Sequence, residues 1–506
     1  MQEASPKKEK SGRNLVRTVL IISAIFLVFA FAVQATDINL EKPLDPGRQE
    51  NVVRVLRLLA DPDFVSVDAE TGRWGMSEAT RVTIERIIET IFMALLASTI
   101  GMILAVPVSF LAARNLMEPI TAPLAAIMAG IIAFPVGGWI TWQVTSGVSQ
   151  LAKRIGDYSW ALAVGVLLVT AVVLWLLWRR GASAAVEEGA TTNQKITLTI
   201  RVIITLFLAI LGIALLALLG LTVGEWLEEK LNLFWFVGNF IAVCADFVRV
   251  FLPPIMALLG GMLAASYGSR YGQEAVLRLK TGPARILTAV LTALGTAIVI
   301  FAIGSFLNWL YEFNNPQNWT TNPALIGGAI AGLLSLLVTP KQPFGIGMAV
   351  YTVSRGILNF LRAIEPLIMA IVFVVWVSLG PFAGIMALTL HSIAALGKLF
   401  SEQIEGIDEG PVEAVTATGA NHLQMITYAV IPQVIPPFTA FALYRWDINV
   451  RMSTIIGFVG GGGIGFVLSQ NISQLRYRQA AVMMIAIAIV VILLDYASSS
   501  IRRRII

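Results

Sequence analysis

The segment EGIDEGPVEAVTATGANHLQMITYAVIP (Glu405–Pro432) is a polar, acidic stretch between two strongly apolar runs. Pro411 suits the first turn of a helix, because the N–H group that proline lacks has no partner in that turn. Val412–Thr418 can continue this helix, and Gly419 is its expected end, since glycine readily takes the left-handed conformation that closes a helix. A second short amphipathic segment, Leu423–Ile431, leads into the next apolar run. The sequence therefore predicts two short helices joined by a turn, held in a loop between membrane spans.

The composition of the whole chain is that of a membrane protein. Of its 506 residues, 57% are hydrophobic and 13% are charged, whereas soluble domains carry about 25% charged residues. Long apolar runs separated by short charged loops explain this deficit better than one oversized core would. We therefore expect an all-α, polytopic transmembrane helical bundle, with the lipid bilayer as its surroundings.

The net charge of +5 is explained by the same pattern of apolar runs and charged loops. Basic residues stand mostly at the ends of apolar runs, where they set membrane topology, and we expect no nucleic-acid partner.

A crossing helix needs about 20 mostly apolar residues, and about twelve runs are candidates. They are Leu15–Ala35, Arg86–Phe110, Ile120–Trp142, Ala161–Trp178, Ile196–Leu221, Val248–Tyr267, Ile286–Leu307, Leu325–Val338, Pro366–Leu379, Pro381–Leu396, Val434–Tyr444 with its continuation, and Ala480–Asp495.

Both termini are expected in the cytoplasm. The first run follows a basic segment and lacks a small-x-small cleavage site, so we interpret it as an uncleaved transmembrane helix. The polar stretch Thr36–Glu85 that follows it is then periplasmic. The chain closes on Arg502–Arg504, which favours a cytoplasmic C-terminus. An even number of spans brings the two basic ends to the same side.

The spacing within Glu405–Pro432 resembles the coupling loop of ABC importer permeases. That pattern is E-A-A, three residues, G, nine residues, then I-x-L-P. Glu413, Ala414, Gly419 and Pro432 stand in register with it. Three positions depart from the pattern, and they are Val415 for the second alanine, Ala429 for the isoleucine and Ile431 for the leucine. Small residues allow such a helix to fit a cleft on an ATPase subunit, and the glycine allows the reversal that presents it.

Neighbouring segments sharpen the resemblance to phosphonate-type ABC permeases. They are NFLRA (Asn359–Ala363), GPFAGIMALTLHSIAALGKLFSEQIEGID (Gly380–Asp408), YRWDINVRMSTIIGFVGGGGIGF (Tyr444–Phe466) and LAARN (Leu111–Asn115). The resemblance implies uptake of phosphonate or a related phosphorus oxyanion, such as phosphate or phosphite, across the bacterial cytoplasmic (inner) membrane. It also implies a type I importer fold with two permease copies, two ABC ATPase subunits and an extracytoplasmic substrate-binding protein. One coupling loop per chain favours a homodimer of this permease.

The middle of the chain departs from this family. Family permeases join the LAARN and NFLRA segments by a short connection, whereas about six further spans intervene here. We therefore expect three parts. Residues 1–116 hold the N-terminal helix, the periplasmic segment and the first permease-core span. Residues 117–350 form an inserted multi-span membrane region, and residues 351–506 form the permease core with the coupling loop.

Four polar residues in the YRWDINVR stretch lie near a predicted span: Arg445, Asp447, Asn449 and Arg451. Charges at membrane depth cost roughly 2.5–3.5 kcal/mol each and usually have partners. One interpretation is that the two arginines line the translocation pathway and donate to an oxyanion. The other is that Asp447 pairs with one arginine and fixes helix packing. The glycines of Gly460–Gly463 have the same two interpretations, an anion-binding nest or close packing.

Other activities are less consistent with the sequence. No G-x-x-x-x-G-K-[ST] motif occurs, so ATP and Mg²⁺ are expected on the partner ATPase subunits and no cofactor on this chain. The single Cys244 and the two histidines, His391 and His422, predict no metal site, and no catalytic residues are expected. A secondary transporter driven by an ion gradient is the alternative, because about twelve spans suit that class. A membrane enzyme is a third candidate.

Overall fold

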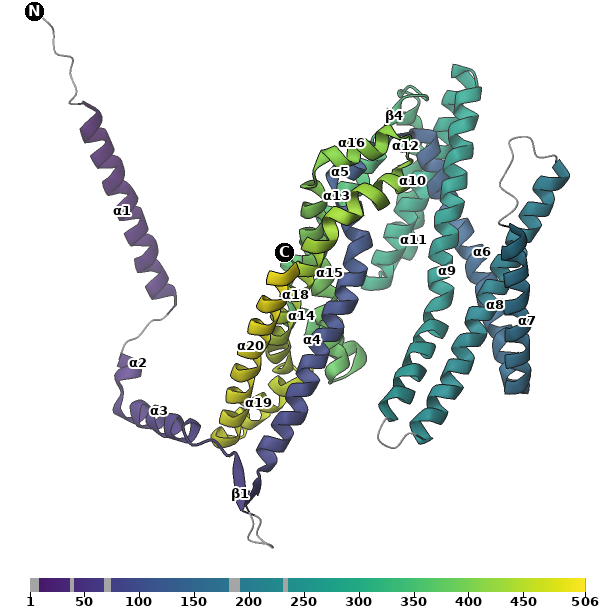
Figure 1. Cartoon of the computed structure of the whole chain (residues 1–506). Coiled ribbons are helices and arrows are strands. Elements are labelled where there is room, and N and C mark those ends of the chain that lie inside the picture. Colours follow the sequence, from purple (N-terminus) through teal and green to yellow (C-terminus); the bar gives the residue numbers. More distant parts are fainter. Residues whose placement is uncertain (1–8, 37–40, 68–73, 182–191, 231–234, 506) are drawn as a thin grey trace, which may run out of the picture. The chain divides into compact units, whose positions relative to one another are not determined.

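The structure is a computed structural model that describes residues 9–36, 41–67, 74–181, 192–230 and 235–505 (Figure 1). Most of these residues lie in helices, and the chain divides into two compact units. Unit 1 consists of Met1–Met117 together with Val350–Ile506, and unit 2 consists of Glu118–Ala349. Each unit is described by itself below.

Unit 1 contains both ends of the chain and the predicted coupling loop. Its elements before residue 118 are α1 (Glu9–Ala35), α2 (Glu41–Leu44), α3 (Pro46–Leu59), the antiparallel strands β1 (Val65–Val67) and β2 (Trp74–Met76), α4 (Glu78–Leu111) and α5 (Arg114–Met117). The later elements are α13 (Ile346–Ala363), α14 (Pro366–Val377), α15 (Pro381–Glu405), α16 (Glu409–Ala417), α17 (His422–Met425), a π-helical turn (Ile426–Val430), α18 (Ile431–Gly457), α19 (Gly463–Ser473) and α20 (Tyr477–Ile505).

The centre of unit 1 is a bundle of α4, α15 and α18, with α20 against α4 and α18 (Figure 1). Small residues on one face of α4 let α15 approach closely: a Cβ atom at Gly101 would lie 2.6 Å from the Cβ of Ser392. Close approach of this kind is how helices gain packing energy in a membrane, where burial of apolar side chains supplies little. The bundle therefore depends on small side chains at its helix contacts.

Unit 2 is a second helical bundle with its own core. Its elements are β3 (Ala122–Pro123), α6 (Leu124–Tyr158), α7 (Trp160–Gly181), α8 (Thr192–Lys230), α9 (Trp235–Arg278), α10 (Thr281–Tyr311), α11 (Pro316–Trp319), α12 (Thr321–Ser335) and β4 (Pro343–Phe344). Helices α6 and α9 pack along each other, and a Cβ at Gly137 would lie 2.7 Å from the carbonyl oxygen of Gly260. Strands β3 and β4 pair antiparallel and so bring the first and last elements of the unit together.

The number of spans is close to the prediction of about twelve. Ten helices in the described ranges are long and apolar enough to cross a membrane, and an eleventh span results if α13 and α14 count as one bent pair. Two of the predicted spans correspond to helices too short to count among these ten. Leu325–Val338 corresponds to the 15-residue α12, and Pro366–Leu379 to the 12-residue α14, which meets α13 at 88°. The break falls at Pro366, where a helix begins more readily than it continues.

Candidate functional site

The short helix predicted at Val412–Thr418 is present as α16, and its ends have clear causes in the sequence. Asp408 caps its N-terminus, since its carboxylate accepts from the backbone N–H of Gly410 at 3.1 Å. Pro411 lies in the first turn, as predicted. The helix ends at Ala417, and Gly419 follows with a φ of +83°, a left-handed conformation that favours glycine. Glu413 and Ala414 lie on this helix and are exposed.

The chain then reverses into a second helical segment. Asn421 and Gln424 form a reciprocal capping box in which each side chain accepts from the other's backbone N–H at 2.9 Å. This box starts α17, and the π-helical turn joins α17 to α18 without a break. Pro432 lies in the first turn of α18. The two short helices of the prediction are therefore both present.

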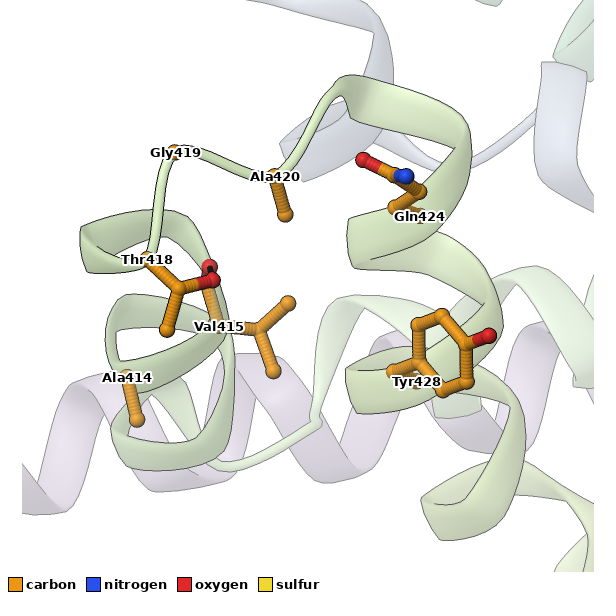
Figure 2. Close-up of a pocket in the computed structure, with 7 residues that line it drawn as sticks. All are labelled: Ala414, Val415, Thr418, Gly419, Ala420, Gln424 and Tyr428. Carbon is orange, nitrogen blue, oxygen red and sulfur yellow. Dashed lines mark hydrogen bonds between the residues drawn. The ribbon is translucent and has the colours of Figure 1, made fainter.

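A groove of about 640 Å³ lies between the two helical segments (Figure 2). Val415 reaches into it from α16, and Gln424 and Tyr428 flank it on the opposite side, with Gly419 and Ala420 at the turn. Tyr428 is 70% exposed. No residue of α16 is buried, and apart from the half-buried Val412 and Val415 its residues are exposed. Such a surface is suited to a partner protein.

The start of the loop is fixed to the rest of unit 1 through Glu405, the last residue of α15. Its carboxylate lies 3.0 Å from the guanidinium of Arg355 on α13, whose side chain is only 17% exposed. The same carboxylate accepts from the backbone N–H of Arg114 at 2.8 Å, and Asn115 Nδ2 donates to the carbonyl of Ile404 at 2.8 Å. The LAARN segment is thus held against the base of the coupling loop.

An apolar cluster packs against the loop formed by α16 and α17. Phe400 on α15 and Phe438 on α18 stack with ring centroids 3.8 Å apart, and both are buried. Val412 of α16 and Met425 of α17 pack against this cluster. The short helices α16 and α17 therefore pack against side chains of α15 and α18.

The second candidate site, the buried polar cluster, comprises Arg445, Asn449, Ser392 and Ser98. Arg445 is 7% exposed and Asn449 is fully buried. Arg445 Nε donates to Ser392 Oγ at 3.1 Å, and Asn449 Nδ2 donates to Ser392 Oγ and to Ser98 Oγ at 2.9 Å each. Arg445 Nη2 and Asn449 Oδ1 are buried without a hydrogen-bond partner among the described residues. The cluster thus offers one cationic donor and one amide acceptor.

The two arginines of the YRWDINVR stretch have different surroundings. Arg451 forms an ion pair with Asp447 one helical turn away, as the packing interpretation expected, and its side chain is 52% exposed while Asp447 is 2% exposed. Arg445 instead faces hydroxyl and amide groups, and the described part of the chain places no carboxylate within 4.0 Å of it. The four residues are neighbours in the sequence, but α18 places Arg445 and Asn449 on one face and Asp447 and Arg451 on another.

The glycine-rich segment favours close packing over an anion-binding nest. A Cβ at Gly384 would lie 2.3 Å from the carbonyl oxygen of Gly461, so α15 approaches this segment very closely. The first N–H groups of α19 already have partners on α4: Gly463 N donates to Glu89 at 3.0 Å and Ile464 N donates to Thr90 at 2.8 Å.

Five residues of these sites were not among the predicted site residues. Asp408, Gln433, Arg355, Ser392 and Ser98 act through contacts with residues far away along the chain. Only Asp408, directly before a predicted helix, has the residue type and place of an N-cap. In the described ranges, no three His, Cys, Asp or Glu side chains come together as metal ligands would.

Comparison with known proteins identifies the family. Residues 328–506 match the family described as "Binding-protein-dependent transport system inner membrane component". A phosphite transport system permease protein of Stutzerimonas stutzeri is 40% identical over 205 residues, which are 38% of this chain and 73% of that protein. The chain belongs to this family of inner membrane components. It is accordingly a multi-pass permease of the ABC importer type and not a secondary transporter driven by an ion gradient.

Two further relatives of this inner membrane component carry related descriptions. A putative cryptic phosphonate transport system permease protein of Escherichia coli is 44% identical over 121 residues, 24% of this chain and 99% of that protein. A phosphate-import permease protein of Mycolicibacterium smegmatis is 39% identical over 184 residues, 36% of this chain and 34% of that protein. A solved structure of the MetNI methionine ABC transporter also matches. The match covers 44% of this chain and 93% of the solved chain, with 20% sequence identity and a TM-score of 0.28.

Proposed function

We propose that this permease moves a phosphorus oxyanion inward, driven by ABC ATPase subunits that dock on the coupling helix α16. The observation that carries the proposal is the exposed helix itself, closed by Gly419 and bordered by a groove of about 640 Å³. A cleft or helix of a partner protein can bind such a surface without any rearrangement of α16. ATP and Mg²⁺ belong to the ATPase partners in this proposal, and the chain itself carries no catalytic role.

The substrate class rests on two supports. The relatives are described as permeases for phosphite, phosphonate and phosphate, which share a tetrahedral phosphorus with anionic oxygens. Arg445 supplies a buried cationic donor near the middle of α18, and guanidinium groups suit such oxyanions geometrically. Asn449 Oδ1 supplies an acceptor that a P–OH group can use. We therefore assign Arg445 and Asn449 to the substrate pathway, and Asp447 and Arg451 to helix packing.

The assembly proposed is the one that this family resemblance implies. A second copy of the permease forms a homodimer, because each chain carries one coupling loop. An extracytoplasmic binding protein delivers the anion, and the coupling loop and both termini face the cytoplasm. Residues 117–350, the inserted region, add further spans to the chain, and residues 1–116 and 351–506 form the permease core.

The test is uptake into proteoliposomes that contain the permease, its ATPase and its binding protein. Phosphate, phosphite and methylphosphonate are offered separately, with ATP on the cytoplasmic side and an ionophore that removes ion gradients. The proposal expects uptake of at least one of these anions that requires both ATP and the binding protein. Uptake without ATP that disappears with the ionophore would refute it.

A further inference from the structure

The coupling helix is attached to the transmembrane helix α18 at a point far from their covalent connection. The side-chain amide of Gln433, in the first turn of α18, meets the backbone of Asp408, which precedes α16. Gln433 Oε1 accepts from the Asp408 N–H at 3.0 Å, and Gln433 Nε2 donates to the Asp408 carbonyl at 3.3 Å. One amide thus satisfies both backbone groups of a residue 25 positions away, as a neighbouring strand would.

Asp408 serves two contacts at once. Its carboxylate caps α16 through Gly410, while its backbone is held by Gln433. Asp408 is exposed, so water could satisfy its backbone groups without help from a side chain. The amide of Gln433 is therefore not needed to satisfy Asp408. Its effect is to fix the N-terminal end of α16 to α18.

The base of α18 is a weak point in the helical hydrogen-bond ladder. The turn Ile426–Val430 is π-helical, and prolines at 432, 436 and 437 lack the N–H groups that would bond to carbonyls one turn earlier. Such turns bend more easily than a regular α-helix. Gln433 Nε2 also donates to the carbonyl of Ala429 at 2.8 Å, so the same amide holds the π-helical turn.

These contacts determine how a movement of α16 reaches α18. If α16 moved with a docked ATPase, the pliable turn at the base of α18 would absorb part of the movement. The direct bond between Asp408 and Gln433 bypasses the π-helical turn Ile426–Val430 and Pro432, while Pro436 and Pro437 follow Gln433 within α18. We propose that Gln433 is a positioning residue that passes the displacement of the coupling helix directly to α18, and so to Arg445 and Asn449, which lie 12 and 16 residues further along the same helix. This inference rests on the proposed ATP-driven import.

The experiment compares wild type with Gln433→Met in the complete transporter of permease, ATPase and binding protein. Methionine has nearly the same length and removes all three hydrogen bonds. ATP hydrolysis and uptake are measured in the same proteoliposomes, with whichever of phosphate, phosphite or methylphosphonate the wild type takes up. Gln474→Met is the matched control, because Gln474 is exposed at the end of α19 and keeps its backbone bond to Gln470.

We expect Gln433→Met to assemble and to hydrolyse ATP, while the number of anions taken up per ATP falls. Loss of one ordinary hydrogen bond changes an equilibrium by roughly fivefold, so the ratio should fall by about fivefold or more. The control should keep the wild-type ratio. An unchanged ratio in Gln433→Met, or ATP hydrolysis and uptake that fall in proportion, would show that the amide only stabilises the loop and would overturn the inference.

A second variant covers the case in which Gln433→Met does not assemble. Gln433→Glu keeps an acceptor for the Asp408 N–H but places a carboxylate against two carbonyl oxygens, so the ratio should also fall, and an unchanged ratio would again overturn the inference. Failure of the proposed function and failure of the role of Gln433 give different results. If wild type shows no ATP-dependent uptake, the proposed function fails and this inference with it. If wild type couples uptake to ATP and both variants do so equally well, only the role of Gln433 is wrong.

Discussion

Replacing Ser392 with alanine removes the hydroxyl that joins α18 to α15 in the buried polar cluster. Ser392 Oγ accepts from Arg445 Nε at 3.1 Å and from Asn449 Nδ2 at 2.9 Å, and all three side chains are buried. Alanine is smaller by one oxygen atom and favours helices, so the substitution introduces no clash. We expect a loss of stability, because Arg445 Nε and Asn449 Nδ2 both lose this acceptor.

The magnitude follows from what each donor retains. A hydrogen bond to a charged group contributes about 1.5–3 kcal/mol and a neutral one about 0.5–1.5 kcal/mol. The Nε of Arg445 loses its acceptor completely, whereas Asn449 keeps its bond to Ser98 Oγ. We therefore expect Ser392→Ala to lower the free energy of unfolding by about 2–4 kcal/mol. Ser98→Ala removes one of two acceptors of Asn449 and should cost about 0.5–1.5 kcal/mol.

Unfolding of the purified permease in detergent, followed by heat or denaturant, measures these differences. Ser473→Ala is the matched control, because Ser473 is exposed and donates only within its own helical turn, to Gln470. Its effect should stay within about 0.5 kcal/mol. The reasoning is refuted if Ser392→Ala is as stable as this control, or if Ser98→Ala proves the more damaging of the two buried substitutions.

Three further substitutions test other parts of the structure. Gly384→Val should lower the unfolding free energy by about 1–3 kcal/mol, because even its Cβ would lie 2.3 Å from the Gly461 carbonyl oxygen, and thermal unfolding measures this. Gly419→Ala should weaken ATPase binding to the purified permease by about 1–2 kcal/mol, since φ is +83° there but no atom lies within 4 Å of the added Cβ. Arg451→Gln should cost about 1–3 kcal/mol of stability, because Asp447 loses its cation, while uptake per assembled complex stays at the wild-type level.

Each of these has a contradicting result. A Gly384→Val protein with unchanged stability would mean that α15 lies further from the glycine-rich segment than described. Equal ATPase affinity after Gly419→Ala would show that the left-handed turn does not control the presentation of α16. Loss of uptake in a well-assembled Arg451→Gln transporter would place that arginine in the substrate pathway.

The coupling loop was predictable because its signals are local. Pro411 and Gly419 specify where a short helix begins and ends whatever surrounds it, and both lie in the structure where their chemistry predicts. The long apolar runs likewise predicted the membrane helices. The predicted run Pro366–Leu379 became the short helix α14, because counting apolar residues takes no account of a helix break such as the one at Pro366.

The contacts that hold the loop against the rest of unit 1 were not predictable from the sequence. Gln433 contacts Asp408, which is 25 residues away in the sequence, and Arg355 contacts Glu405, which is 50 residues away. Only the tertiary structure brings these residues together. A glutamine at the start of an apolar helix has no distinguishing pattern of its own. The separation of Arg445 from Arg451 also required the structure, since it depends on which face of α18 each side chain occupies.

Thiol cross-linking from α16 to the ATPase tests the central claim most directly. The single native cysteine, exposed Cys244, is first changed to serine, and Ala414→Cys then places one thiol on the coupling helix. In the assembled transporter this thiol should cross-link to the ATPase subunit, whereas Leu475→Cys, 69% exposed at the far end of α19, should not. An active transporter in which position 414 never reaches the ATPase, or reacts with reagents confined to the extracytoplasmic side, would contradict the account.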